Sequence, residues 1–161
     1  MSIRAYRDED FSWLLEFNNS CVPEVGQLNA EQLEALIQLA DRIRVFELNG
    51  IAVAALITLV PNSNYQSSNY KWFDKNFQNY LYVDRIMVSS AARGAGVGKA
   101  LYLDLQQQAV EEQRQHIFCE VNELPPNPKS MAFHQKIGFS PLESRVDPAS
   151  QKTVCMLSWA L

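Results

Sequence analysis

The pattern of apolar and polar positions along the chain predicts an alternation of strands and helices. Short apolar or alternating runs, which are typical of strands, occupy positions 3–6, 44–48, 51–59, 80–88, 117–121, 139–145 and 153–159. Apolar residues at helical spacing predict helices from Asp8 or Asp10 through Phe17, from Asn29 through Ala40, over 97–113 and over 130–136. Asn49-Gly50 marks a hairpin between two of the strands. This order of elements predicts a mixed α/β layer.

The stretch from 61 to 79 fits neither periodicity and predicts a long polar and aromatic loop. Loops of this length are usually functional or disordered. The aromatic content, which includes Tyr65, Tyr70 and Trp72, argues against disorder. Two interpretations stay open: the rings either shape a substrate entrance, as an apolar wall or a cage around a cation, or pack the loop onto the rest of the protein.

Composition places the chain among single-domain proteins. Its 161 residues, 47% of them hydrophobic, predict one domain over 1–161 with a sizeable core. The formal net charge of −4 argues against nucleic acid as the main partner, because a phosphate backbone attracts basic surfaces. The three cysteines form no C-x-x-C pair and predict neither a disulfide framework nor a metal site. The first ten residues include acidic side chains and no apolar run, and no apolar stretch reaches about 18 residues. We therefore expect a cytoplasmic protein with neither a signal peptide nor a membrane partner.

The most informative segment is the glycine-rich turn between the apolar run 80–88 and the helical pattern from Val97. Glycines at 94, 96 and 98 let the backbone approach a ligand closely. A helix that begins there directs unpaired N–H groups and the positive end of its dipole at the turn. The turn therefore predicts a phosphate-bearing ligand that is held mainly by the backbone.

Three phosphate-binding patterns compete for this turn. A Walker A loop fails because Arg93 stands at its first glycine and Ala100 replaces the hydroxyl that binds magnesium. A dinucleotide fingerprint fails because Lys99 stands at its third glycine. The third pattern, Q/R-x-x-G-x-G/A, matches Arg93-Gly94-Ala95-Gly96-Val97-Gly98 at every position.

That third pattern resembles the pyrophosphate-binding loop of the GNAT superfamily, the GCN5-related N-acetyltransferases. A second segment resembles the family's later motif: Asn127, the small Ser130, His134 where the family has an aromatic residue, and then Lys136-x-Gly-Phe139. The two motifs come in the family's order, with one helix and one strand predicted between them. The resemblance covers most of the chain.

The resemblance implies a GNAT fold, an α/β fold with a mixed, mostly antiparallel central sheet of about seven strands and helices on both faces. The strand before the glycine turn and the strand after the following helix are expected to splay apart and admit the pantetheine arm of acetyl-CoA. Backbone N–H groups would hold the pyrophosphate, and the N–H of Met87 or Val88 would stabilise the developing oxyanion. The residues implied for coenzyme binding are Ile86, Met87, Val88, Arg93, Gly94, Ala95, Gly96, Val97, Gly98, Lys99, Asn127 and Ser130. Asn127 could equally form an Asn-Pro turn, Ser130 could equally be a helix N-cap, and Arg93 could equally pair with an acidic side chain.

Amine acetylation needs a group that accepts the proton of the attacking nitrogen. Glu120 resembles the glutamate that some ribosomal-protein acetyltransferases use, and Asp84 lies on the strand before the glycine turn. A water chain without a dedicated base is the third option. Strand alternation directs Arg85 to the face opposite Asp84, so we expect Asp84 to find a partner elsewhere.

His134 departs from the family, which usually has a tyrosine here that donates to the coenzyme sulfur as general acid. A histidine with an ordinary pKa of about 6.5 is only partly protonated at neutral pH, although a neutral ring still carries one N–H. We expect His134 to assist departure of the thiolate. The alternative is a helix histidine that only packs or binds water.

The resemblance thus predicts an N-acetyltransferase that transfers the acetyl group of acetyl-CoA to a primary amine. The acceptor, a small molecule or a peptide or protein amine, is not determined by family membership. The alternative is a catalytically silent acyl-CoA-binding or sensor domain, and a larger acyl donor is compatible with the sequence. A homodimer is also compatible with it, because the C-terminal strands could pair or swap.

Overall fold

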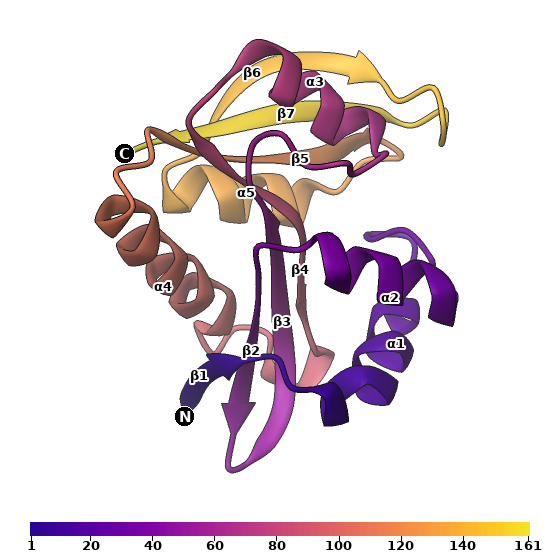
Figure 1. The fold of residues 1–161 in the computed structure, drawn as a ribbon, viewed down its shortest axis with the longest axis vertical. Coiled ribbons are helices and arrows are strands. Elements are labelled where there is room, and N and C mark those ends of the chain that lie inside the picture. Colours follow the sequence, from indigo (N-terminus) through magenta and orange to yellow (C-terminus); the bar gives the residue numbers. More distant parts are fainter. The chain divides into compact units, whose positions relative to one another are not determined.

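The computed structural model describes residues 1–161 and contains seven strands and five α-helices (Figure 1). The strands are β1 (Ser2–Ala5), β2 (Arg42–Leu48), β3 (Ile51–Leu59), β4 (Tyr80–Val88), β5 (His116–Leu124), β6 (Ser140–Val146) and β7 (Thr153–Ala160). The α-helices are α1 (Phe11–Ser20), α2 (Ala30–Leu39), α3 (Ser68–Asn76), α4 (Val97–Glu111) and α5 (Pro128–Ile137), and 3-10 turns occupy Asp8–Asp10 and Ser90–Ala92. The sheet order is β1-β2-β3-β4-β5-β7-β6. The predicted mixed α/β fold of about seven strands is confirmed.

The chain divides into two compact units. Unit 1 contains residues 1–59 and 83–105, and unit 2 contains residues 60–82 and 106–161. Both β4 and α4 therefore contribute residues to each unit. That the chain acts as one domain stays a prediction.

Unit 1 is built on the antiparallel strands β1, β2 and β3. The turn between β2 and β3 has φ of 51° at Asn49 and 76° at Gly50, the left-handed backbone that the Asn-Gly signal predicts. Asn29 caps α2 as predicted: its side chain accepts from the backbone N–H of Gln32, whose side chain in turn accepts from that of Asn29. Leu14 of α1 and Leu33 of α2 are fully buried, so both helices bury an apolar face.

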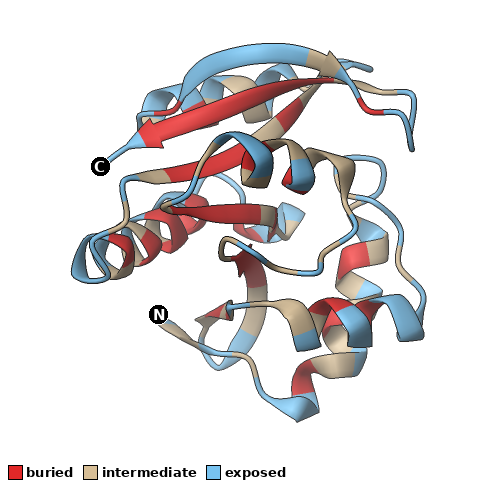
Figure 2. Cartoon of the chain, turned by 45° about the horizontal axis from the view of Figure 1, so that its top comes forward, coloured by how far each residue is buried: buried red, intermediate tan, exposed pale blue.

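Unit 2 is built on β5, β7 and β6, which pair antiparallel, and on the start of β4, which pairs parallel with β5 from Tyr80↔His116 to Tyr82↔Phe118. Figure 2 shows β7, the strand that ends near the C-terminus, buried along most of its length. The edge strand β6 is almost entirely exposed.

Helix α3 (Ser68–Asn76) corrects the prediction of a long polar and aromatic loop over 61–79. Ser67 caps the helix by accepting from the backbone N–H of Tyr70. Tyr70 and Phe73 are buried, and the Phe73 ring stacks on Phe118 of β5 with the centroids 4.7 Å apart. The helix was missed because, apart from Trp72, its other residues are polar, so the burial of one narrow face is a tertiary effect.

None of the helices is both long and apolar enough to span a membrane.

Candidate active site

The glycine-rich turn lies in unit 1, between the 3-10 turn Ser90–Ala92 and the start of α4. Gly94 and Gly96 have φ of 81° and 78°, a left-handed backbone that side-chain-bearing residues rarely adopt. A Cβ at either position would meet no atom within 4 Å. The glycines therefore serve the backbone conformation, and the space beside them is open to a ligand.

The start of α4 supplies the N–H groups that the sequence predicts for a phosphate. The backbone N–H of Ala100 donates to the carbonyl of Gly96 at 2.9 Å. Val97, Gly98 and Lys99 precede it in the first turn, where N–H groups lack partners within the helix. Lys99 and Arg93 are exposed, and the Arg93 Nε lies 3.4 Å from the carbonyl oxygen of Val88. Amides, helix dipole and cations together fit a diphosphate.

The residues predicted to line the coenzyme arm, Ile86, Met87 and Val88, are the last three of β4, next to this turn. Met87 is 2% exposed, whereas Ile86 and Val88 are half-buried, so the strand keeps its alternation to its end. Beyond it, the N–H of Ser89 donates to Val53 of β3 at 2.9 Å. The Met87 side chain thus belongs to the core, and the group of Met87 that is predicted to act is its backbone N–H.

Asp84 is held by the arginine next to it, which corrects the expectation of a partner from elsewhere. The Arg85 Nε lies 2.7 Å from the Asp84 carboxylate, and both side chains are nearly buried. Arg85 Nη1 donates to Asn18 Oδ1 at 2.6 Å and to the carbonyl of Gly26 at 3.2 Å. The long guanidinium side chain bends back along the strand, which Cβ directions alone do not reveal. Asp84 thus belongs to a buried ion pair that fastens the segment after α1.

Glu120 lies on β5 in unit 2 and accepts hydrogen bonds from neighbouring elements. The hydroxyl of the fully buried Tyr82 of β4 donates to both carboxylate oxygens at 2.9 Å. Asn69 of α3 donates through Nδ2 at 3.3 Å, and Asn69 Oδ1 in turn accepts from Arg145 Nη1 of β6 at 2.7 Å. The sequence singled out neither Asn69 nor Arg145, because they lie far along the chain from Glu120.

His134 lies in α5, 4% exposed, with its Nδ1 2.7 Å from the backbone carbonyl oxygen of Ser130. A carbonyl oxygen only accepts, so Nδ1 carries a proton in this contact and Nε2 of the neutral ring carries a lone pair. Burial lowers the pKa of His134, and the carbonyl contact opposes this only in part. The neutral ring is therefore favoured, and as long as Nδ1 donates to the Ser130 carbonyl, only the imidazolium could also donate from Nε2. Nδ1 also lies 3.3 Å from the Ser130 hydroxyl oxygen.

Asn127 and Ser130 form the first turn of α5. Asn127 is the N-cap, since its side chain accepts from the backbone N–H of Ser130 at 3.3 Å, and Pro128 takes the first helical position. The alternative in which Ser130 is the N-cap is wrong, because Ser130 is already the third helical residue. Capping does not conflict with a coenzyme contact, since the Asn127 side chain retains its N–H donors.

Glu120 and His134 belong to opposite faces of the sheet in unit 2. Glu120 shares a face of β5 with Phe118, which packs on α3. Trp159 of β7 pairs with Ile117 and thus lies on the other face, where it contacts Phe139 and the end of α5 at Gly138. Of the predicted site residues in unit 2, Glu120 therefore stands alone on the α3 face, and His134, with α5, lies on the other.

The aromatic residues of 61–79 mainly pack. Tyr70 is 1% exposed, its hydroxyl donates to the carbonyl of Val60 at 2.7 Å, and its ring contacts Tyr82 with the centroids 5.4 Å apart. The ring of Trp72 contacts Phe73 and Phe77. These contacts favour the packing interpretation over a cation cage.

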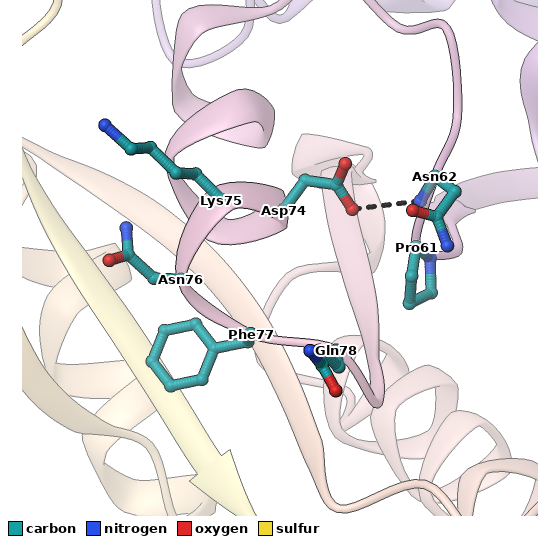
Figure 3. Close-up of a pocket in the computed structure, with 7 residues that line it drawn as sticks. All are labelled: Pro61, Asn62, Asp74, Lys75, Asn76, Phe77 and Gln78. Carbon is teal, nitrogen blue, oxygen red and sulfur yellow. Dashed lines mark hydrogen bonds between the residues drawn. The ribbon is translucent and has the colours of Figure 1, made fainter.

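A polar hollow of about 410 Å³ lies beside the C-terminal end of α3 (Figure 3). It is lined by Pro61, Asn62, Asp74, Lys75, Asn76, Phe77 and Gln78, none of which is a predicted site residue. The Asp74 carboxylate accepts from the backbone N–H of Asn62 at 2.9 Å and from the Tyr80 hydroxyl at 2.6 Å. The Asp74 carboxylate in this hollow thus holds the segment before α3 against the helix.

A comparison with protein families finds one match that decides the identity of the fold. The model described as "Acetyltransferase (GNAT) family" matches residues 5–139. The chain belongs to the GNAT acetyltransferase family. No curated protein sequence matches the chain.

Solved GNAT acetyltransferases share the fold of this family member at low sequence identity. The ribosomal-protein-alanine N-acetyltransferase of Brucella melitensis is 18% identical, with a TM-score of 0.76 and 100% of both chains covered. Ard1 of Thermoplasma volcanium is 15% identical with a TM-score of 0.80, covering 99% of this chain and 97% of that one. The yncA protein of Salmonella typhimurium, solved with its cofactor acetyl-CoA, is 16% identical with a TM-score of 0.73, covering 100% of this chain and 94% of that one.

Proposed function

We propose that this GNAT family member is an N-acetyltransferase that transfers the acetyl group of acetyl-CoA to a primary amine. The observation that carries the proposal is the glycine turn: two left-handed glycines with open space beside them precede a helix start in a chain of this family. Acetyl-CoA is present in the solved yncA structure, and CoA in the solved NatC complex with a Gag peptide. These neighbours support the same co-substrate here.

The residues of this chain fit the co-substrate in two sets. In unit 1, the backbone of 93–98 with Arg93 and Lys99 would hold the diphosphate, and the β4 backbone at Ile86, Met87 and Val88 would pair with the arm. In unit 2, Asn127 and Ser130 would contact the arm. When bound, acetyl-CoA supplies an activated acyl group, and the protein contributes position, charge stabilisation and proton transfer.

Glu120 is the base that the geometry favours. Its carboxylate accepts hydrogen bonds from the Tyr82 hydroxyl and the Asn69 amide, which are electrically neutral donors from two neighbouring elements. Asp84 is paired directly with Arg85, which favours a structural role. In the proposed reaction Glu120 accepts the proton of the amine, while the N–H of Met87 or Val88 donates to the oxygen that gains negative charge.

His134 would assist departure of the CoA thiolate from the α5 face of the sheet, whereas Glu120 lies on the α3 face. Because Nδ1 donates to Ser130, assistance to the thiolate must come from Nε2 of the imidazolium. The imidazolium is the form that burial disfavours. We therefore expect any contribution of His134 as an acid to decrease as the pH rises through its lowered pKa.

A matched pair of glycine variants tests coenzyme binding. Gly96 and Gly50 have φ of 78° and 76°, and neither position has an atom within 4 Å of a built Cβ. G96A and G50A should therefore lose similar unfolding free energy, about 1 kcal/mol each. Isothermal titration calorimetry should show weaker acetyl-CoA binding in G96A alone. Equal affinity in the two variants would contradict the proposed diphosphate site.

An acceptor screen tests the transfer. CoA thiol release from acetyl-CoA is measured with alanine-initiated peptides first, because two neighbours are titled ribosomal-protein-alanine or ribosomal-protein-S18-alanine N-acetyltransferase. Lysine side chains, polyamines and small alkyl amines follow, with propionyl-CoA and succinyl-CoA as alternative donors. Acetyl-CoA binding without release for any amine would favour the catalytically silent acyl-CoA-binding domain.

A further inference from the structure

A relay of side chains in unit 2 ends on Glu120. Arg145 Nη1 of β6 donates to Asn69 Oδ1 at 2.7 Å, and Asn69 Nδ2 of α3 donates to Glu120 Oε1 at 3.3 Å. The three residues come from three elements and lie within one unit. The guanidinium thus contacts the carboxylate's donor rather than the carboxylate.

The chemistry of the three groups allows one orientation of the amide. A guanidinium only donates and an ionised carboxylate only accepts, so the amide oxygen of Asn69 must face Arg145 and its NH₂ must face Glu120. The reversed amide would place two donors together at Arg145 and two acceptors together at Glu120. Arg145 therefore determines which end of Asn69 the carboxylate meets.

The first turn of α3, which carries Asn69, is fastened independently of the relay. Ser68 donates to Asp147 in the turn between β6 and β7, and Asp147 also accepts from the backbone N–H groups of Ala149 and Ser150. These bonds lower the pKa of Asp147 despite its burial. Ser68 therefore provides a control position: it anchors the same turn without contacting Glu120.

We propose that Asn69 and Arg145 are positioning residues, which orient the Glu120 carboxylate as a proton acceptor through the amide of Asn69. The proposal rests on the function proposed above, in which Glu120 is the base. The oriented NH₂ of Asn69 donates to Glu120 Oε1 in a fixed direction, which aligns the carboxylate for proton transfer. The Tyr82 hydroxyl, which lies 2.9 Å from both carboxylate oxygens, supplies a second donor that helps to orient Glu120.

Other charged or titratable groups on the surrounding elements must be separated from the relay. Within unit 2 they are Tyr80 and Tyr82 on β4, His116, Cys119 and Glu123 on β5, Glu143 on β6, Asp147 and Lys152 in the β6–β7 turn, Cys155 on β7, Tyr70, Lys71, Asp74 and Lys75 on α3, and Lys129, His134 and Lys136 on α5. A variant at Asn69 or Arg145 leaves all of these side chains in place. The titration of Glu120 itself must therefore be observed.

The first test follows the ¹³C carboxyl resonance of Glu120 against pH in the full chain without ligand, assigned by its loss in E120Q. N69A and R145M should raise the titration midpoint, because a donor to the charged form is lost or misdirected. R145K, which keeps a cationic donor, should stay close to the unmodified protein, and S68A should not change it. N69D keeps the contact with Arg145 but presents oxygen to Glu120, so its midpoint should rise further.

A double variant separates a relay from a charge that acts through space. If Arg145 acts through Asn69, R145M should shift the midpoint about threefold less in the N69A background than in the unmodified protein. Equal shifts in the two backgrounds, or a shift in S68A as large as in N69A, would overturn the relay. Thermal melts confirm that each variant is folded.

The second test measures kinetics with acetyl-CoA and an alanine-initiated peptide. N69A and R145M should lower kcat about 10-fold with KM for acetyl-CoA unchanged and the acidic limb of the pH profile displaced, as expected for a misaligned base. Unchanged kcat and pH profile in both variants would overturn the positioning role. If neither this peptide nor any other amine is acetylated, the proposed function fails, whereas the NMR titration still decides whether the relay exists.

Discussion

Each unit of the molecule contains an arginine, an asparagine and a carboxylate in contact, but the contacts follow a different order. In unit 1, Arg85 is at the centre and contacts both Asp84, at 2.7 Å, and Asn18, at 2.6 Å. In unit 2, the asparagine is at the centre, so that Arg145 contacts Asn69 and Asn69 contacts Glu120. The central residue decides whether the carboxylate of each set contacts a guanidinium, as Asp84 does, or an amide, as Glu120 does.

The difference teaches that side-chain identity alone does not define a role. Arg85 is 9% exposed, and its charge needs Asp84 because a lone buried charge is costly. Arg145 is half-buried on the otherwise exposed edge strand β6, where water can still reach a guanidinium, and it contacts the neutral amide of Asn69. Glu120 accepts hydrogen bonds from the Tyr82 hydroxyl and the Asn69 amide.

The largest effect is expected from E120Q. Loss of a general base should lower kcat/KM by about 10²- to 10⁴-fold for an alkyl amine that is cationic at neutral pH, measured by thiol release. An aromatic amine is already neutral and should lose much less. D84N is the matched variant in unit 1, and its kcat/KM per folded molecule should stay within about threefold. A larger loss in D84N than in E120Q would reverse the comparison.

The next effect concerns stability and falls on unit 1. R85M leaves the Asp84 carboxylate buried without its cation, so the free energy of unfolding in urea should fall by about 3–5 kcal/mol. R145M, from the exposed edge strand, should cost about 1 kcal/mol or less. Equal losses in the two variants would show that the two arginines are structurally equivalent.

The buried His134 extends the comparison to a group that is kept uncharged. Burial lowers its pKa, so below an ordinary histidine pKa of about 6.5 the unfolded chain binds a proton that the folded chain does not. The stabilising contribution of the neutral ring is complete above pH 6.5 and is lost as the pH falls through the lowered pKa. The free energy of unfolding should decrease over this window.

Denaturation curves between pH 5 and 8 check this dependence with the chain's two histidines. H134F keeps an aromatic ring against Phe133 and Phe139 and should flatten the curve. H116F should retain the slope. Asp10 and Asp147 have lowered pKa values, so their protonation changes the free energy of unfolding only below about pH 4, outside the measured range. A slope that survives in H134F would assign the dependence to another group.

The smallest effect compares two asparagine caps, Asn29 of α2 in unit 1 and Asn127 of α5 in unit 2. N29A and N127A each remove a side-chain acceptor for a backbone N–H and should each cost about 1 kcal/mol of unfolding free energy. Only N127A should also weaken acetyl-CoA binding, because only Asn127 is proposed to contact the coenzyme arm. Unaltered binding in N127A would leave that residue with capping alone.

Local features of the chain were predictable because their causes lie within a few residues. The Asn49-Gly50 turn and the Asn29 cap follow from backbone conformations and hydrogen bonds between near neighbours. The motif of Arg93 to Gly98 is likewise local, and the turn has the backbone that it predicts. Helix α3 was not predictable in this way, since its packing on Phe118 depends on a strand about 45 positions away.

By itself, the sequence determined the order of strands and helices, the glycine turn and the family, because periodicity, turn chemistry and short motifs act locally. Only the tertiary structure decided that Arg85 pairs with Asp84, that Asn69 and Arg145 meet at Glu120, and that Glu120 and His134 lie on opposite faces of one sheet. Such contacts depend on side-chain reach and on strand register between distant segments. Neither quantity is carried by the spacing of residues along the chain.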